Sequence, residues 1–140
     1  MSAPWTDPVS AAGTSRRVLV VDDDADIRDL VGLYVKGGGY AVALASGGAH
    51  ALEVVRERGA PDLAVLDVTM PDMDGIALLA ALRAEPGLAN LPVIFLSARV
   101  TPADIARGVE LGAAYLTKPF VGSALLGLIG RLLVAQPAEW

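Results

Sequence analysis

The 140-residue chain contains no cysteine, so disulfide bonds, thiolate metal ligands and cysteine nucleophiles are all excluded. It has a single histidine, His50, which lies on a predicted helix without a cluster of partner residues; we interpret it as a surface side chain. The first 17 residues include Pro4, Asp7 and Pro8 but no apolar stretch of the kind that a secretory signal needs. We therefore expect a cytoplasmic protein.

The chain also lacks an excess of positive charge. It has 11 Lys and Arg against 16 Asp and Glu, a net charge of −5, which argues against direct binding of nucleic acid. Its last apolar segment, residues 122–134, is too short and too interrupted to span a membrane. What the chain does contain is 54% hydrophobic and only 19% charged residues, which predicts one globular domain with a buried core.

Hydrophobic periodicity divides the chain into alternating strands and helices. We predict a disordered N-terminal arm over residues 1–15, a folded domain over 16–135 and a short C-terminal tail over 136–140. Within the domain, short β-branched runs alternate with segments that have helical spacing. The predicted strands are 18–21, 40–45, 63–66, 92–96 and 114–116, and the predicted helices are 25–36, 47–58, 76–84, 102–111 and 122–134. Because the connections are short and crossovers are right-handed, this order predicts an α/β fold with a doubly wound, five-stranded parallel sheet.

Local signals add detail to two kinds of feature, helix ends and buried faces. Asp24 is suited to cap the helix 25–36, and Thr101 with Asp104 forms a capping-box pattern before the helix 102–111.

In the first helix, we predict a buried stripe of Ile27, Leu30, Val31 and Tyr34. In the last helix, the predicted core positions are Leu125, Leu128, Ile129 and Leu132. Leu126 and Leu133 fall outside that stripe, and we expect an exposed leucine ridge for a partner or for self-association.

Polar side chains gather where the predicted strands end. Asp22 and Asp23 follow the first strand, Asp67 the third and Ser97 the fourth, and Lys118 lies just past the fifth. The carboxyl ends of parallel strands share one edge of the sheet, where ligand sites form. Three crowded carboxylates repel one another unless a cation neutralises them, and oxygen ligands of this kind suit Mg²⁺. A lysine beside them provides a mobile positive charge that suits a phosphate group.

These residues resemble the full signature of the receiver domain of response regulators in two-component signalling. The resemblance covers about residues 16–134 and rests on four segments in the family's order and with similar spacing: Val20-Val21-Asp22-Asp23, Leu66-Asp67 with Met70-Pro71-Asp72-Met73-Asp74-Gly75, Ser97-Ala98, and Lys118-Pro119-Phe120. It implies a flavodoxin-like, CheY-like sheet with strand order 2-1-3-4-5.

The resemblance also implies chemistry. Asp67 would accept a phosphoryl group from a sensor histidine kinase or a phosphotransfer protein. Mg²⁺ would be held by Asp22, Asp23, Asp67 and the backbone carbonyl of Thr69. Such a domain catalyses only its own phosphorylation and dephosphorylation, so we do not expect an enzyme with a separate substrate.

The family pattern further implies a switch. Lys118 would pair with the phosphoryl oxygens, and the Lys118–Pro119 bond would be cis. Ser97 would move toward the phosphoryl group while the ring of Tyr115 turns inward. The output would be a changed surface on the fourth helix, fifth strand and fifth helix that binds a downstream protein or a second copy.

Two other functions stay open at this point. A pseudo-receiver would use the same fold to bind a protein without phosphotransfer, although the acid pair, Asp67 and Lys118 are all present. A small phosphatase of similar topology would normally have a second acid two residues after its nucleophile, where this chain has Thr69. Taken alone, residues 22–24 would be explained as a capping cluster for the helix that follows.

Overall fold

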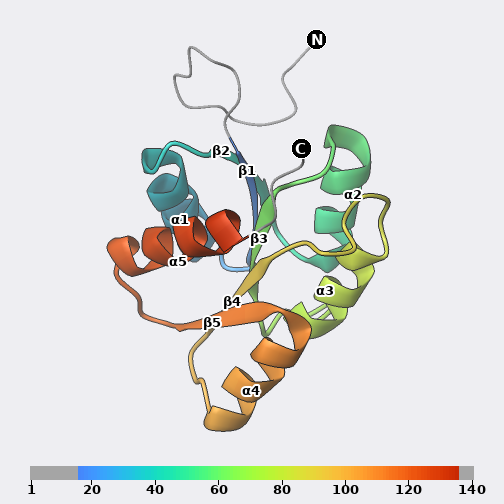
Figure 1. The fold of residues 1–140 in the computed structure, drawn as a ribbon. Coiled ribbons are helices and arrows are strands. Elements are labelled where there is room, and N and C mark those ends of the chain that lie inside the picture. Colours follow the sequence, from blue (N-terminus) through green and yellow to red (C-terminus); the bar gives the residue numbers. More distant parts are fainter. Residues whose placement is uncertain (1–15, 136–140) are drawn as a thin grey trace.

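Five parallel strands form a single sheet in the computed structural model, which describes residues 16–135 (Figure 1). The predicted arm, 1–15, and the predicted tail, 136–140, lie outside the described residues. The strand order is β2-β1-β3-β4-β5, which confirms the predicted fold class. The strands are β1 (Arg17–Val21), β2 (Ala41–Ala45), β3 (Leu63–Asp67), β4 (Val93–Ser97) and β5 (Ala113–Thr117).

Five helices cover the two faces of this sheet. They are α1 (Ala25–Gly37), α2 (Gly48–Arg58), α3 (Gly75–Arg83), α4 (Pro102–Leu111) and α5 (Gly122–Ala135). Every boundary of a helix or strand lies within one residue of the predicted position. The helices α1 and α5 lie together on one face, and α2, α3 and α4 lie on the other (Figure 1).

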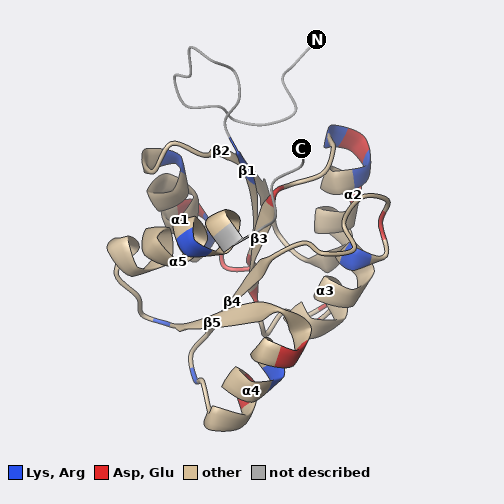
Figure 2. Cartoon of the chain, viewed as in Figure 1, with Lys and Arg blue, Asp and Glu red and all other residues tan. Residues whose placement is uncertain are grey.

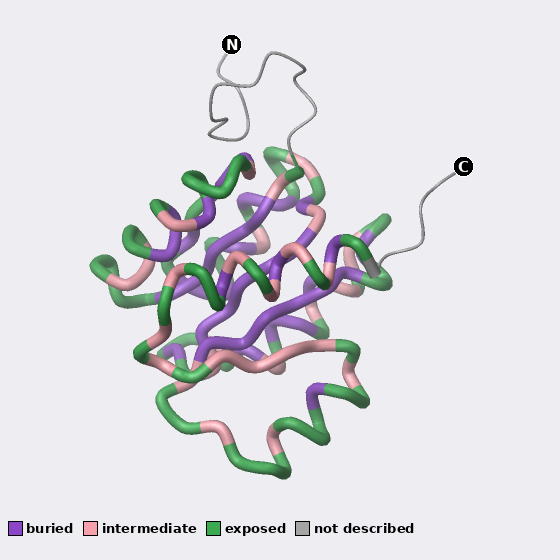
Figure 3. Tube along the Cα trace, turned by 60° about the vertical axis from the view of Figure 1, so that its left-hand side comes forward, coloured by how far each residue is buried: buried purple, intermediate pink, exposed green. Residues whose placement is uncertain are grey.

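Alternate residues of the central strands face two separate hydrophobic clusters. Leu19 and Val21 of β1 pack toward α2 and α3, whereas Val18 and Val20 pack toward α1 and α5. The central strands are buried on both faces, and β5 at the edge is only partly buried (Figure 3). Burial on both faces explains why these strands are continuous apolar runs in the sequence. Charged side chains lie on helices, in loops and at the ends of strands (Figure 2).

The capping predictions are confirmed. The Asp24 carboxylate accepts hydrogen bonds from the backbone N–H groups of Asp26 and Ile27 at the start of α1. At the start of α4, Thr101 and Asp104 form a reciprocal capping box, with distances of 3.1 and 2.9 Å. Among residues 16–135, no helix combines the length and apolar character that crossing a membrane requires.

Two predictions about buried helix faces are confirmed only in part. Val31 in α1 and Leu125 and Ile129 in α5 are buried as predicted, and the other predicted residues that pack partly buried against the core are Ile27, Tyr34, Leu128 and Leu132. Leu30 is 42% exposed, because α1 instead turns Val31 and Val35 onto the sheet. In α5, the buried line is Leu125, Ile129 and Leu133, at a spacing of four residues.

The expected leucine ridge on α5 is therefore absent from the described surface. Leu133 is buried in the core, and Leu126 packs over Gly38, where even an added Cβ would lie 2.5 Å from the leucine side chain. A glycine after α1 thus provides the space for Leu126, which the helical pattern of α5 alone does not show.

Gly75 is required where α3 begins against the end of β3. An added Cβ at Gly75 would lie 2.7 Å from the Asp67 carbonyl oxygen and 3.1 Å from the Val68 Cα, both backbone atoms. A Cβ added at Gly127 in α5 would have no neighbouring atom within 4 Å. We expect Gly75→Ala to lower the free energy of unfolding by about 1–3 kcal/mol and Gly127→Ala to raise it by up to about 1 kcal/mol. Urea unfolding of both variants tests this, and a Gly75→Ala protein as stable as the parent would contradict it.

Candidate functional site

Three carboxylates meet at the carboxyl end of the central strands. Asp22 follows β1 and Asp67 ends β3, and the two strands are neighbours with Val21 in register with Leu66. One carboxylate oxygen from each of Asp22, Asp23 and Asp67 lies within 4.8 Å of the other two. Asp22 is fully buried and Asp67 is 6% exposed, whereas Asp23 faces solvent. This is the one such cluster of potential metal-ligating side chains that the described residues contain.

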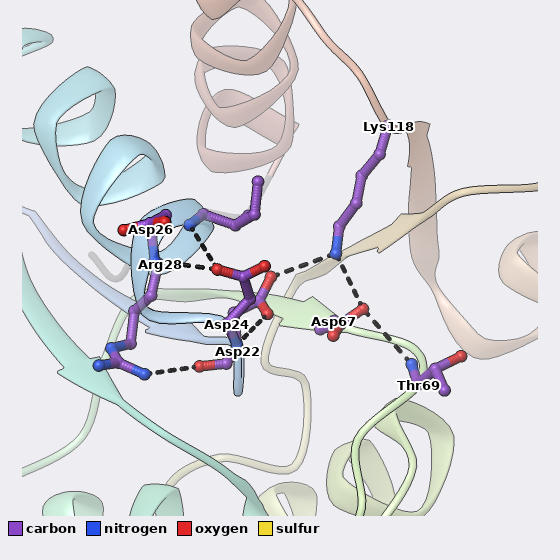
Figure 4. A network of polar contacts seen from close by, with 8 residues as sticks. Asp22, Asp24, Asp26, Arg28, Asp67, Thr69 and Lys118 are labelled. Carbon is purple, nitrogen blue, oxygen red and sulfur yellow. Dashed lines mark hydrogen bonds and ion pairs between the residues drawn. The ribbon is translucent and has the colours of Figure 1, made fainter.

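Lys118 connects the two buried acids (Figure 4). Its Nζ lies 3.3 Å from Asp22 Oδ2 and 3.2 Å from Asp67 Oδ1. The lysine follows β5, its backbone N–H donates to the Ser97 carbonyl at 2.7 Å, and the Lys118–Pro119 peptide bond is cis, as the resemblance implied. In the sequence, Lys118 is 96 residues from Asp22 and 51 residues from Asp67. The parallel sheet brings the three residues into contact.

The electrostatics of the cluster favour binding of a further cation. Burial, followed by repulsion from Asp22, raises the pKa of Asp67 to about 6, and Lys118 only partly opposes this. Burial lowers the pKa of Lys118, but attraction to Asp22 and Asp67 outweighs it, and the net shift is upward. Lys118 therefore stays charged at neutral pH, and a cation beside Asp67 would favour its ionised form.

The donor atoms fit a hard divalent ion. All three side chains offer carboxylate oxygens, and the exposure of Asp23 leaves room for the waters that Mg²⁺ retains. Thr69, the predicted source of a backbone carbonyl ligand, lies in the adjoining loop. Its N–H donates to Asp67 Oδ1 at 3.4 Å, so this loop is in contact with the acid (Figure 4).

Arg28, which sequence reasoning missed, holds the acidic segment from α1. Its Nη1 donates to the Asp22 carbonyl oxygen at 2.9 Å, and the Asp24 N–H donates to Asp22 Oδ1 at 3.0 Å (Figure 4). These bonds fix both the backbone and the carboxylate of Asp22. Arg28 lies six residues beyond Asp22, a separation that spans the strand-to-helix turn and follows no helical or strand period.

Asp72 was also missed, because it stands among turn residues. Its carboxylate accepts from the N–H groups of Gly48 at 3.3 Å and Ala49 at 3.0 Å, and these bonds lower its pKa. It thereby caps α2, whose own N-cap residue, Gly47, has no side chain to do so. The sequence did offer one signal for this cap. Gly47 and Gly48 begin α2 without a side chain that could cap it, so a capping group from another segment could have been expected. The loop that carries Thr69 is thus anchored to α2.

The predicted switch residues lie near the cluster but outside its hydrogen bonds. The Ser97 hydroxyl donates to the Arg99 carbonyl at 2.7 Å and accepts from the Arg99 N–H at 3.2 Å. The Tyr115 ring is partly buried, with its centroid 5.0 Å from that of Phe95. The structure therefore brings together Asp22, Asp23, Asp67 and Lys118, while Ser97 and Tyr115 occupy the adjoining strands. His50 is exposed, as predicted, and its Nδ1 accepts from the Ser46 N–H.

Residues 18–129 match the sequence model of the response regulator receiver domain. The chain belongs to this family. The signalling class inferred from the motifs is thereby confirmed, and the acid–lysine cluster lies within the matched residues.

Relatives and solved structures agree with this assignment. The transcriptional regulatory protein PrrA of Mycobacterium tuberculosis is 44% identical over 121 residues, which are 86% of this chain and 51% of that protein. GltR of Pseudomonas aeruginosa is 42% identical over 123 residues, 87% of this chain and 50% of its own length. The chain thus spans about half the length of these curated relatives. The Vibrio cholerae chemotaxis protein CheY4 superposes with a TM-score of 0.78 and 31% identity, over 85% of this chain and 99% of that one.

The raised pKa of Asp67 predicts a pH-dependent effect of removing its charge. Because the folded state favours protonated Asp67, its ionisation costs stability as pH rises from about 4 to above 6. In magnesium-free buffer at pH 8, we expect Asp67→Asn to be more stable than the parent, with a free energy of unfolding that is larger by roughly 1–3 kcal/mol. The difference should shrink as pH falls through 6 toward 4.

Asp23→Asn is the matched control, because Asp23 belongs to the same cluster but is exposed. Its effect on the free energy of unfolding at pH 8, measured with urea, should be smaller than that of Asp67→Asn. An Asp67→Asn protein less stable than the parent at pH 8 would show that the ionised form is favoured in the fold.

Proposed function

We propose that this receiver domain accepts a phosphoryl group on Asp67 from a sensor histidine kinase or a phosphotransfer protein. The observation that carries the proposal is the position of Lys118, whose ammonium group contacts both Asp22 and Asp67 at 3.2–3.3 Å. A lysine in this position can leave one carboxylate and pair with an incoming phosphoryl group without leaving the site.

In the proposed reaction, an oxygen of the Asp67 carboxylate forms a bond to phosphorus as the bond between phosphorus and the donor nitrogen breaks. The products are an acyl phosphate on Asp67 and the free imidazole of the donor. Charge in such transfers is spread over the phosphoryl oxygens, so positioning and electrostatic stabilisation provide most of the rate. Lys118 pairs with these oxygens and also favours the ionised form of Asp67.

The cluster would hold Mg²⁺ through Asp22, Asp23 and Asp67, with the Thr69 carbonyl as a fourth protein ligand. When bound, the ion supplies positive charge that stabilises the phosphoryl oxygens. Arg28 and Asp72 position these ligands by fixing the Asp22 backbone and the loop of Thr69. The chain then acts only on its own phosphorylation state and has no separate substrate.

The output surface that we propose comprises α4, β5 and α5. Ile105 and Val109 of α4 are 56% and 75% exposed, and Val121, the residue before α5, is also exposed. Tyr115 lies against α4, since a Cβ at Gly108 would be 3.0 Å from its ring. A movement of Ser97 toward the phosphoryl group, with rotation of Tyr115, would therefore change how α4 packs on β5. We propose that this surface binds a downstream protein or a second copy.

We further propose that the chain works in the cytoplasm without contacting nucleic acid itself, in keeping with its net charge of −5. A relative that is 37% identical, MtrA of Mycobacterium tuberculosis, is a DNA-binding response regulator, but the matched segment is only 54% of its length.

Intact mass spectrometry after incubation with acetyl phosphate and Mg²⁺ tests the proposal directly. We expect one added phosphoryl group on the parent and none on Asp67→Asn or in the presence of a chelator. A folded parent protein that gains no phosphoryl group from acetyl phosphate or from phosphorylated histidine donors would overturn the proposal in favour of a pseudo-receiver.

Lys118→Gln should slow phosphorylation by about 10²-fold or more, because one preorganised charge on the phosphoryl oxygens is lost. It also removes the lysine that opposes the raised pKa of Asp67. The rate is measured by intact mass over time, with circular dichroism to show that the variant is folded. An unchanged rate in the folded variant would remove Lys118 from the proposed chemistry.

A further inference from the structure

An apolar groove is lined by residues of α1 and of the edge strand β2, and by no residue of the acid cluster or of α4. Figure 1 shows where these two elements lie in the fold. It has a volume of about 340 Å³ and is lined by Asp29, Gly32, Leu33, Lys36, Val42 and Leu44. Two of the lining residues, Leu33 and Leu44, are 68% and 38% exposed. A single exposed leucine needs no explanation, but two in the lining of one apolar groove indicate a contact surface.

The four α1 residues of this groove have the spacing of a helix-packing hole. Positions 29, 32, 33 and 36 are i, i+3, i+4 and i+7, the set that receives one side chain from a facing helix in knobs-into-holes packing. Gly32 has no side chain to fill the hole, and Leu44 of β2 forms one wall of the groove beside it, with its Cδ2 atom 3.0 Å from where a Cβ of residue 32 would be. The groove therefore fits a leucine that projects from a second helix.

The charges of the groove indicate which helix this is. Asp29 and Lys36 are two turns apart on the same face of α1, with Gly32 and Leu33 midway between them. Neither takes part in an ion pair within residues 16–135. When a second α1 lies antiparallel, Asp29 faces the partner's Lys36, and Lys36 faces the partner's Asp29. A parallel arrangement would place like charges together.

We propose that two copies of this chain associate through α1 in an antiparallel, two-fold symmetric pair. Leu33 of each copy enters the groove of the other over the partner's Gly32, and the two Asp29–Lys36 contacts flank it. The same surface patch serves both copies, as an isologous interface requires. The pair does not depend on phosphorylation of Asp67, and its few apolar side chains place it among weak, concentration-dependent dimers.

Sedimentation equilibrium of the full 140-residue chain over a range of concentrations tests the surface. We expect the parent to dimerise and Leu33→Asn to raise the dissociation constant at least about tenfold. Glu53→Asn is the control, since Glu53 is exposed on α2, outside both α1 and the proposed output surface, and it should leave dimerisation unchanged. A parent that stays monomeric at millimolar concentration, or a dimer that Leu33→Asn leaves intact, would overturn the proposal.

Charge reversal tests the antiparallel orientation. Asp29→Lys and Lys36→Asp should each weaken the dimer severalfold, because each places like charges at both ends of the interface. The double variant should restore it. Failure of the double variant to recover any affinity over the single variants would contradict the pairing.

Because the chain has no cysteine, cross-linking gives an independent test. A mixture of Asp29→Cys and Lys36→Cys proteins should form a disulfide-linked dimer under mild oxidation, whereas each alone should not, since its two thiols lie too far apart across the pair. Cross-linking of each variant alone, at a rate equal to that of the mixture, would show that the helices do not pack in this register.

Discussion

The fold places two acids side by side in a buried position, where burial and repulsion from Asp22 raise the pKa of Asp67. Asp22 and Asp67 lie at the ends of adjacent central strands, and the ammonium group of Lys118 makes this arrangement tolerable by contacting both. Buried charges cost free energy unless they are paired, so the lysine and the two acids depend on one another. The surrounding contacts, from Arg28 to the Asp22 carbonyl and from Asp72 to α2, hold the segments that bear these charges.

Most of this arrangement follows from the sequence, because its causes are local or periodic. The strands are short β-branched runs and the helices carry caps, so their boundaries could be read within one residue. A parallel sheet necessarily collects the ends of its strands at one edge. For that reason, the three polar segments that carry Asp22 and Asp23, Asp67 and Lys118 could be placed at one site from strand order alone.

The predictions that failed depend on contacts between elements. Leu126 was expected at the surface because its position in α5 is off the core stripe, yet Gly38, nearly ninety residues earlier, leaves a space that it fills. Leu30 has the spacing of a core residue but is 42% exposed, because the face of α1 that packs on the sheet is the one that carries Val31 and Val35. Arg28 and Asp72 were missed for the same reason: each bonds to the backbone of another segment, and such a pairing is set by the fold. For Asp72 the only sequence signal was indirect, namely that Gly47 cannot cap α2 itself.

The cap that Asp72 gives to α2 has a consequence for building chimeras between receivers. Only four residues separate Asp67 from Asp72. Within this short loop, the Thr69 N–H donates to the Asp67 carboxylate and the Asp72 carboxylate accepts from the first turn of α2. Neither segment is a self-contained module, because the helix would lose its cap if the loop were exchanged alone. Grafts that transfer residues 68–74 should therefore transfer residues 46–49 with them, and insertions between Asp67 and Asp72 should be avoided altogether.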